Sequence, residues 1–165
     1  MVIDTVSKNI AEFKGDVIIY PCDCDLTYRK TLLEKAGDRL LKEMNAIGFC
    51  KIGNAVITQG YELRCKHIVF IPIINHETDE TIDSNTLHTA IHNAFTLAEL
   101  YKLKTIGIAS FQTNRKRGST IDKLKSFLFT GDYNPEQRKI EVEDMINAIA
   151  KNFNNTSIEK ITIFK

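Results

Sequence analysis

A cluster of small polar side chains follows a strongly apolar run near the start of the chain. Residues 16–20 read as a buried strand, and Cys22, Asp23, Cys24 and Asp25 come soon after it. In an open α/β sheet, ligands bind outside the carboxyl ends of the strands, so this position predicts a binding site. Asp23 and Asp25 resemble a pair of catalytic carboxylates, but no general acid or metal partner accompanies them in the sequence.

The segment after this cluster lacks the glycines that a phosphate-binding loop needs. Leu-Thr-Tyr-Arg-Lys-Thr occupies residues 26–31, where bulky side chains such as Tyr28 and Arg29 obstruct a close approach of phosphate to the backbone. Basic side chains could replace those backbone contacts: Arg29, Lys30, Arg115, Lys116 and Arg117. For the basic run at 115–117, an ordinary solvated loop is the favoured interpretation.

Cysteines and histidines give little indication of a metal. Cys22 and Cys24 are one residue apart on an extended segment, which places their side chains on opposite faces and departs from the usual zinc spacing. His88 and His92 have the i, i+4 spacing of a zinc pair, but the residues around them form an ordinary amphipathic pattern. We therefore expect reduced thiols, surface or half-buried histidines, no metal and no cofactor.

Length and composition indicate one globular domain over residues 1–165. The chain is 43% hydrophobic, and its 22 basic and 21 acidic residues leave a net charge of +1. Such a balance provides no global attraction to nucleic acid or to an anionic membrane. The start of the chain has no basic segment followed by an apolar one, and no apolar run approaches the length of a membrane span. A cytoplasmic location without membrane contact is the expectation.

Strand and helix patterns alternate along the chain. Apolar, β-branched runs predict strands, and apolar residues at helical spacing predict helices. The predicted strands are residues 2–6, 16–20, 54–59, 67–74, 105–111 and 158–164, and the predicted helices are residues 31–47, 84–103 and 142–153. Residues 60–66 suit a hairpin-like connection, and Ser84 or Asn85 suits a helix cap. This order predicts a three-layer α/β/α fold with a mixed, mostly parallel central sheet.

One irregular basic and aromatic connection, residues 112–139, interrupts the alternation. A long connection after a central strand is often functional. Its aromatic residues, interleaved with Lys123 and Lys125, suit base stacking, but packing onto the core is the favoured interpretation; they are Phe127, Phe129 and Tyr133.

Several segments resemble the macro domain, the ADP-ribose-binding α/β module. Residues 51–63 resemble its G-x-A-x-x-T-x-G-Y-x-L segment, and this is the most specific match. Residues 33–37 resemble the end of the family's first helix, and residues 97–100 with 104–109 resemble its helix–strand pair before the second phosphate loop. The resemblance covers most of residues 2–114 and implies the same three-layer fold.

The resemblance also implies where the ligand would lie. Its adenine-contacting Asp falls on Asn9, beside Ile10, and its ribose-contacting Asn falls on Asp23. Cys24 matches a cysteine in the branch that includes ADP-ribose-phosphate phosphatases and DNA ADP-ribosyl hydrolases. The implied ligand-binding set is Asn9, Ile10, Cys22, Asp23, Cys24, Tyr28, Arg29, Gln112, Thr113, Asn114 and Arg115, with Asp23 as the candidate catalytic residue.

Three functions are compatible with these patterns. The favoured one is a divergent macro domain that binds an ADP-ribose-related nucleotide, with no efficient hydrolysis because the glycine loops are lost. The second is an ADP-ribose-phosphate phosphatase or ADP-ribosyl hydrolase in which Asp23 orients water or ribose. The third is a protein- or nucleic-acid-interaction module with a closed pocket, in which the basic residues of 115–125 form the contact surface.

Overall fold

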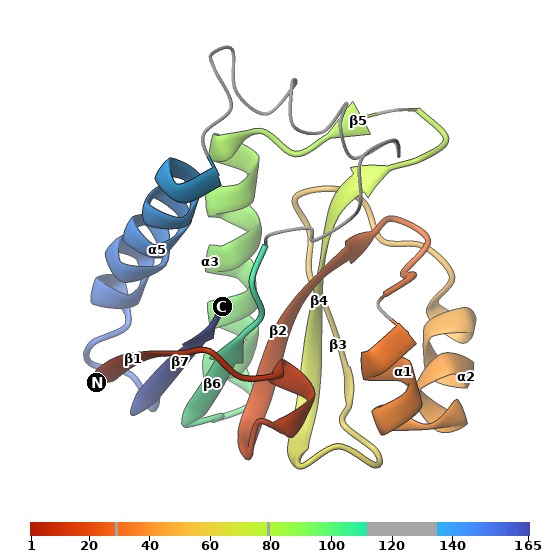
Figure 1. The fold of residues 1–165 in the computed structure, drawn as a ribbon, viewed down its shortest axis with the longest axis horizontal. Coiled ribbons are helices and arrows are strands. Elements are labelled where there is room, and N and C mark those ends of the chain that lie inside the picture. Colours follow the sequence, from red (N-terminus) through yellow and green to blue (C-terminus); the bar gives the residue numbers. More distant parts are fainter. Residues whose placement is uncertain (29, 79, 112–134) are drawn as a thin grey trace.

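A computed structural model describes residues 1–28, 30–78, 80–111 and 135–165 (Figure 1). Strands and helices alternate as the sequence patterns predict. The strands are β1 (Val2–Val6), β2 (Gly15–Asp23), β3 (Val56–Gln59), β4 (Cys65–Asn75), β5 (Glu80–Thr81), β6 (Thr105–Ile108) and β7 (Lys160–Phe164). The helices are the short 3-10 helix η1 (Ile10–Glu12), α1 (Lys30–Ala36), α2 (Asp38–Ile47), α3 (Ser84–Leu100) and α5 (Pro135–Asn152). Among the described helices, none is both long and apolar enough to cross a membrane.

The strands form a seven-stranded sheet in the order β1-β7-β6-β2-β4-β3, with β5 paired to β4. The pairs β1–β7, β7–β6, β6–β2 and β2–β4 are parallel, whereas β3 and β5 run antiparallel to β4. The mixed, mostly parallel sheet predicted from the sequence is therefore confirmed. The hairpin-like connection predicted for residues 60–66 is also confirmed, because it joins the antiparallel strands β3 and β4.

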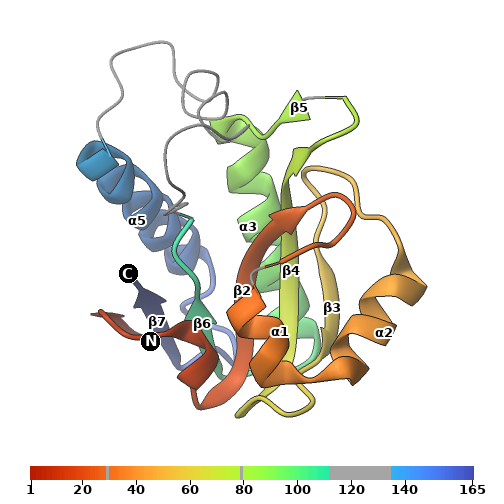
Figure 2. The same cartoon turned by 45° about the vertical axis from the view of Figure 1, so that its right-hand side comes forward.

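Helices cover both faces of the sheet (Figures 1 and 2). Along β2, Val17 and Ile19 pack in a core cluster with α3 and α5, while Ile18 and Tyr20 pack in a second cluster with α1 and α2. Burial on both faces explains why β2 reads as a continuous apolar run and shows no strict alternation of polar and apolar residues.

Two helix predictions were wrong in detail. The single helix predicted for residues 31–47 is broken into α1 and α2 at Gly37, whose φ of +80° is accessible to glycine and costly for other residues. The cap of α3 is Asp83, not Ser84 or Asn85, because the Asp83 carboxylate accepts a 2.7 Å hydrogen bond from the Thr86 backbone N–H.

Several element boundaries also differ from the sequence prediction. β6 ends at Ile108, earlier than predicted, whereas α5 begins at Pro135, ahead of the predicted residue 142. The short elements η1 and β5 are not predicted by periodicity, since three or two residues are too few to show a pattern. The predicted roles of the basic and aromatic residues at 115–133 lie outside the described residues.

A partly buried hydrogen-bond cluster around Asp16 fixes the amino ends of β2 and β6 against each other. The Asp16 carboxylate accepts hydrogen bonds from the backbone N–H groups of Lys104 and Thr105 at 2.9 and 3.0 Å, and pairs with the Lys66 ammonium at 2.6 Å. Burial raises the pKa of Asp16, but the hydrogen bonds from Lys66, Lys104 and Thr105 outweigh it and lower the pKa from 3.8 to about 2.

We expect Asp16→Asn to lower the free energy of unfolding at neutral pH by about 1 kcal/mol, less than the full equivalent of this pKa shift because solvent screens the pair with the exposed Lys66. Since the folded-state pKa is depressed, this stabilisation is present above about pH 4 and disappears as the pH falls toward 2. Urea unfolding of both proteins between pH 7 and pH 2 measures the difference. Parallel pH profiles for the two proteins would contradict the prediction.

Candidate functional site

The carboxyl ends of β2 and β6 form a topological switch point, the place where the crevice of an open α/β sheet is expected. These neighbouring parallel strands lead to helices on opposite faces of the sheet, β2 to α1 and β6 to α5 (Figure 2). Ligands of open α/β sheets bind at such switch points. Asp23 is the last residue of β2, so the structure places it beside this crevice.

The Asp23 carboxylate is engaged by its own loop. Its Oδ1 accepts a 2.9 Å hydrogen bond from the Thr27 backbone N–H, its Oδ2 accepts one from the Thr27 hydroxyl, and the residue is only 8% exposed. The neighbouring Asp25 is exposed, so the two carboxylates differ in environment and do not form a matched pair. Asp23 therefore holds the β2–α1 loop closed.

Leu26 occupies a position in this loop where a glycine would be unstrained. Its φ is +61°, in the left-handed region that costs a non-glycine residue roughly 1 to 2 kcal/mol. Its side chain is 2% exposed and packs in the core cluster beneath α1 and α2. Burial of the leucine offsets the strain, and the Thr27 N–H that a phosphate would use is already bound to Asp23.

Tyr28 turns inward rather than into solvent. Its ring packs against Phe70 of β4 with a centroid distance of 5.2 Å, in the core cluster on the α1 side of the sheet. Within the described residues, its buried hydroxyl has no hydrogen-bond partner. Burial raises the pKa of Tyr28 to about 12. The tyrosine thus anchors the loop to the sheet.

The Cys22 thiol near the crevice is protonated and not activated. Cys22 and Cys24 are buried, and the Cys50 N–H donates a 2.9 Å hydrogen bond to the Cys24 carbonyl. Burial, followed by Asp23, Cys50 and Cys24, raises the pKa of the Cys22 thiol far above its usual range. Such a thiol is a poor nucleophile, so these cysteines form part of the wall beneath the crevice.

Asn9 and Ile10, the residues implied for adenine contact, form the start of η1. The Asn9 side chain caps this short helix by accepting a 3.0 Å hydrogen bond from the Ala11 N–H. Ile10 packs partly buried against the core cluster beside α1. Ligand contact by either residue stays a prediction. The other implied contacts, Arg29 and residues 112–115, lie outside the described residues.

His76 is a site residue that sequence reasoning missed. It follows β4, the parallel neighbour of β2, and its Nε2 lies 3.6 Å from the Asp23 Oδ2. Its side chain is 48% exposed, whereas that of Asp23 is 9% exposed. The signal available in the sequence was its place directly after a predicted strand, because carboxyl ends of adjacent parallel strands meet at one edge. His92, in contrast, packs on the ring of Phe153.

A family sequence model described as Macro domain matches residues 29–121, more than half of the chain. The chain therefore belongs to the macro domain family. A relative from Fusobacterium nucleatum, named as an uncharacterised protein, is 31% identical over 108 residues, which are 63% of this chain and 62% of the relative. The match therefore spans less than two thirds of that relative's length.

Solved macro domains share the fold. The macro domain of ganglioside-induced differentiation-associated protein 2 superposes with a TM-score of 0.70 at 16% identity, covering 98% of this chain and 75% of the other. The Trypanosoma brucei macrodomain in complex with ADP-ribose gives a TM-score of 0.66 at 16% identity, covering 99% and 64%. At these identities the likeness establishes the fold and leaves the ligand of this chain to be argued from its own residues.

Proposed function

We propose that the protein binds an ADP-ribose-related nucleotide in the crevice between β2 and β6, without efficient hydrolysis. The observation that carries the proposal is the placement of the Asp23 loop at this crevice in a macro fold. A macro domain of the same fold is known in complex with ADP-ribose, which supports a ligand of this class. Partly buried polar groups beside an open strand end suit ribose hydroxyls.

Weak hydrolysis of the bound nucleotide is expected because the polar groups of the Asp23 loop already form hydrogen bonds with one another. Asp23 accepts a hydrogen bond from Thr27 at each carboxylate oxygen, which leaves fewer acceptor positions to orient a water. The Cys22 thiol is protonated. The Thr27 N–H is also committed, so backbone binding of a pyrophosphate at this position requires the loop to open. Binding with modest affinity is the expected outcome.

We expect Asp23→Asn to strengthen ADP-ribose binding about fivefold, because it removes a negative charge that repels the pyrophosphate across several ångströms. The asparagine oxygen can still accept the Thr27 N–H hydrogen bond. Asp23→Ala removes that anchor as well, and binding should weaken. Isothermal titration calorimetry with ADP-ribose measures all three proteins.

Asp25→Asn is the matched control, since it makes the same charge change two residues away at an exposed position. It should leave the affinity nearly unchanged. An absence of binding heat for every protein at millimolar ADP-ribose would reject the proposed function. Equal strengthening by Asp23→Asn and Asp25→Asn would show that general charge, and not the position of Asp23, sets the affinity.

The contact between Asp23 and His76 favours a second function, hydrolysis of an ADP-ribose derivative. An exposed imidazole next to a buried carboxylate is oriented to act as a general base or acid. This alternative predicts that the wild-type protein releases phosphate from ADP-ribose phosphate, or ADP-ribose from a modified macromolecule. Release should then disappear in the Asp23→Asn protein, even though its binding becomes stronger.

A further inference from the structure

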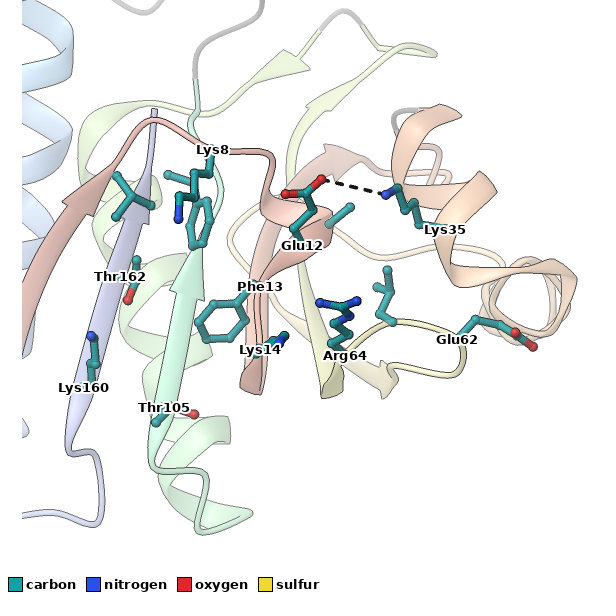
Figure 3. Close-up of a pocket in the computed structure, with 14 residues that line it drawn as sticks. Lys8, Glu12, Phe13, Lys14, Lys35, Glu62, Arg64, Thr105, Lys160 and Thr162 are labelled. Carbon is teal, nitrogen blue, oxygen red and sulfur yellow. Dashed lines mark ion pairs between the residues drawn. The ribbon is translucent and has the colours of Figure 1, made fainter.

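A cavity lies on the α1 side of the sheet over β6 and β7 (Figure 3). Its volume is about 810 Å³. α1 and α2 pack beside β2 and β4, whereas among the described residues η1 and the Phe13 ring cover this part of the sheet (Figures 1 and 3). Along β7, Lys160 and Thr162 face the cavity, while Ile161 and Ile163 pack in the opposite core cluster. We call this cavity the basic groove.

Cationic side chains dominate the rim of the basic groove. Five basic and two acidic residues line it, namely Lys8, Lys14, Lys35, Arg64 and Lys160 with Glu12 and Glu62. Lys35 lies 4.0 Å from Glu12, and Lys160 pairs with Asp4 at 2.8 Å. Lys8, Lys14 and Arg64 have no acidic partner within ion-pair distance in the described part of the chain (Figure 3). The groove therefore carries unpaired positive charge.

The floor of the basic groove is apolar and tightly packed. The Phe13 and Phe164 rings meet edge to face with a centroid distance of 5.8 Å. Phe13 is 8% exposed, and its ring lies directly over Gly107, where an added Cβ would come within 2.9 Å of it. These rings line the groove but are largely buried and meet edge to face, so the groove lacks the flat stacking platform that single-stranded nucleic acids use.

The charges on the rim and the apolar floor of the basic groove together indicate what kind of molecule binds there. Glu12 and Glu62 interrupt the cations and would repel a continuous phosphate backbone. A peptide places its carboxylates at intervals and carries apolar side chains between them, which suits an apolar floor with separate cations on the rim. We propose that the basic groove docks an acidic segment of a partner protein that carries apolar side chains among its carboxylates.

The basic groove runs from the amino edge of the sheet to η1. Lys160, Thr105 and residues 62–64 belong to the amino ends of β7, β6 and β4, the edge opposite to Asp23. At its other end the groove is lined by Lys8 and Ala11, which flank Asn9 and Ile10. Peptide docking depends on Lys14 and Arg64, whereas the proposed nucleotide binding depends on Asp23, so substitutions at these residues distinguish a failure of one from a failure of the other.

The test uses a short fluorescein-labelled peptide of glutamate and leucine, titrated with the full chain and followed by fluorescence anisotropy. We expect saturable binding that weakens with salt. The double variant Lys14→Glu with Arg64→Glu should lose about tenfold in affinity, because two exposed attractions become repulsions. A peptide with glutamine in place of glutamate should bind weakly to every protein.

Lys151→Glu is the matched control, because it reverses one exposed charge on α5, on the opposite face of the sheet (Figure 2). It should bind the peptide as the wild type does. Circular dichroism of the double variant should match the wild-type spectrum. Equal peptide binding by the wild type and the double variant would overturn the proposal, as would an RNA oligonucleotide that displaces the peptide and binds more tightly.

Discussion

Phe70→Ala should lower the free energy of unfolding by about 4 kcal/mol and weaken ADP-ribose binding roughly tenfold. Phe70 is fully buried, and truncation of a buried phenylalanine leaves a large cavity. Its ring also contacts the rings of Tyr20, at 6.2 Å, and of Tyr28, at 5.2 Å. Loss of the Tyr28 contact releases the β2–α1 loop beside the crevice. The free energy of ordering this loop again then reduces the free energy of ligand binding.

Phe95→Ala is the matched control for this prediction. Phe95 is also fully buried and packs on another aromatic ring, Phe153 at 5.4 Å, but it lies in the core cluster with α3 and α5. Urea unfolding should show a similar loss of stability in both variants. Calorimetry should show weaker nucleotide binding only in Phe70→Ala.

Limited proteolysis gives a readout that does not depend on a ligand. Lys30 is exposed at the start of α1, directly after the loop that Tyr28 anchors. Trypsin should cleave after Lys30 faster in Phe70→Ala than in Phe95→Ala, since local opening exposes the chain. If both variants were cleaved at the same rate, Phe70 would support the fold as a whole and have no particular effect on the loop.

The carboxyl end of β2 could be predicted from the sequence because it depends on local patterns. β2 is an apolar run buried on both faces, and the small polar residues that follow it mark a strand end. The alternation of strands and helices then sets a parallel sheet, and the crevice lies at its carboxyl edge. These inferences need only the spacing of residue types along the chain.

The contacts within the site could not be predicted, because they depend on backbone conformation and strand pairing that the sequence pattern does not show. Asp23 accepts from Thr27 only because Leu26 adopts a left-handed conformation, which sequence patterns disfavour for leucine. His76 reaches Asp23 because β2 and β4 pair in parallel with an irregularity between Cys22 and Asp23. Gly37 could have indicated the break in the first long helix, but the helical spacing of apolar residues continues on both sides of it and predicts a single helix.

The most specific family match, residues 51–63, runs from the carboxyl edge of the sheet along β3 to the amino edge. Its Gly60 and Leu63 belong to the turn between β3 and β4, at the amino end of β4. The parallel pairing of Gly15 with Cys65 places this turn at the opposite edge from Asp23. The end of the segment is thus a structural turn in this chain, away from Asp23.

Gly60→Ala should lower the free energy of unfolding by about 3 kcal/mol, which differential scanning calorimetry detects as a fall in Tm. A Cβ on Gly60 would overlap the Cys65 carbonyl oxygen and lie 2.9 Å from the carbonyl carbon. The Gly60 N–H donates a 2.8 Å hydrogen bond to the Lys66 carbonyl, so the backbone cannot move aside without breaking the hairpin.

Gly48→Ala separates this steric effect from the general cost of replacing a glycine. Gly48 has a φ of +77°, but its Cβ would meet nothing nearer than 3.8 Å. Only backbone strain remains there, and a loss of about 1 kcal/mol in the free energy of unfolding is expected.

Because the β3–β4 turn carries Arg64, Gly60→Ala should also weaken peptide docking in the basic groove, while Gly48→Ala should not. Equal destabilisation by the two substitutions would contradict this prediction. It would mean that the turn adjusts to the added methyl group, and that contact with the Cys65 carbonyl does not explain the glycine at position 60.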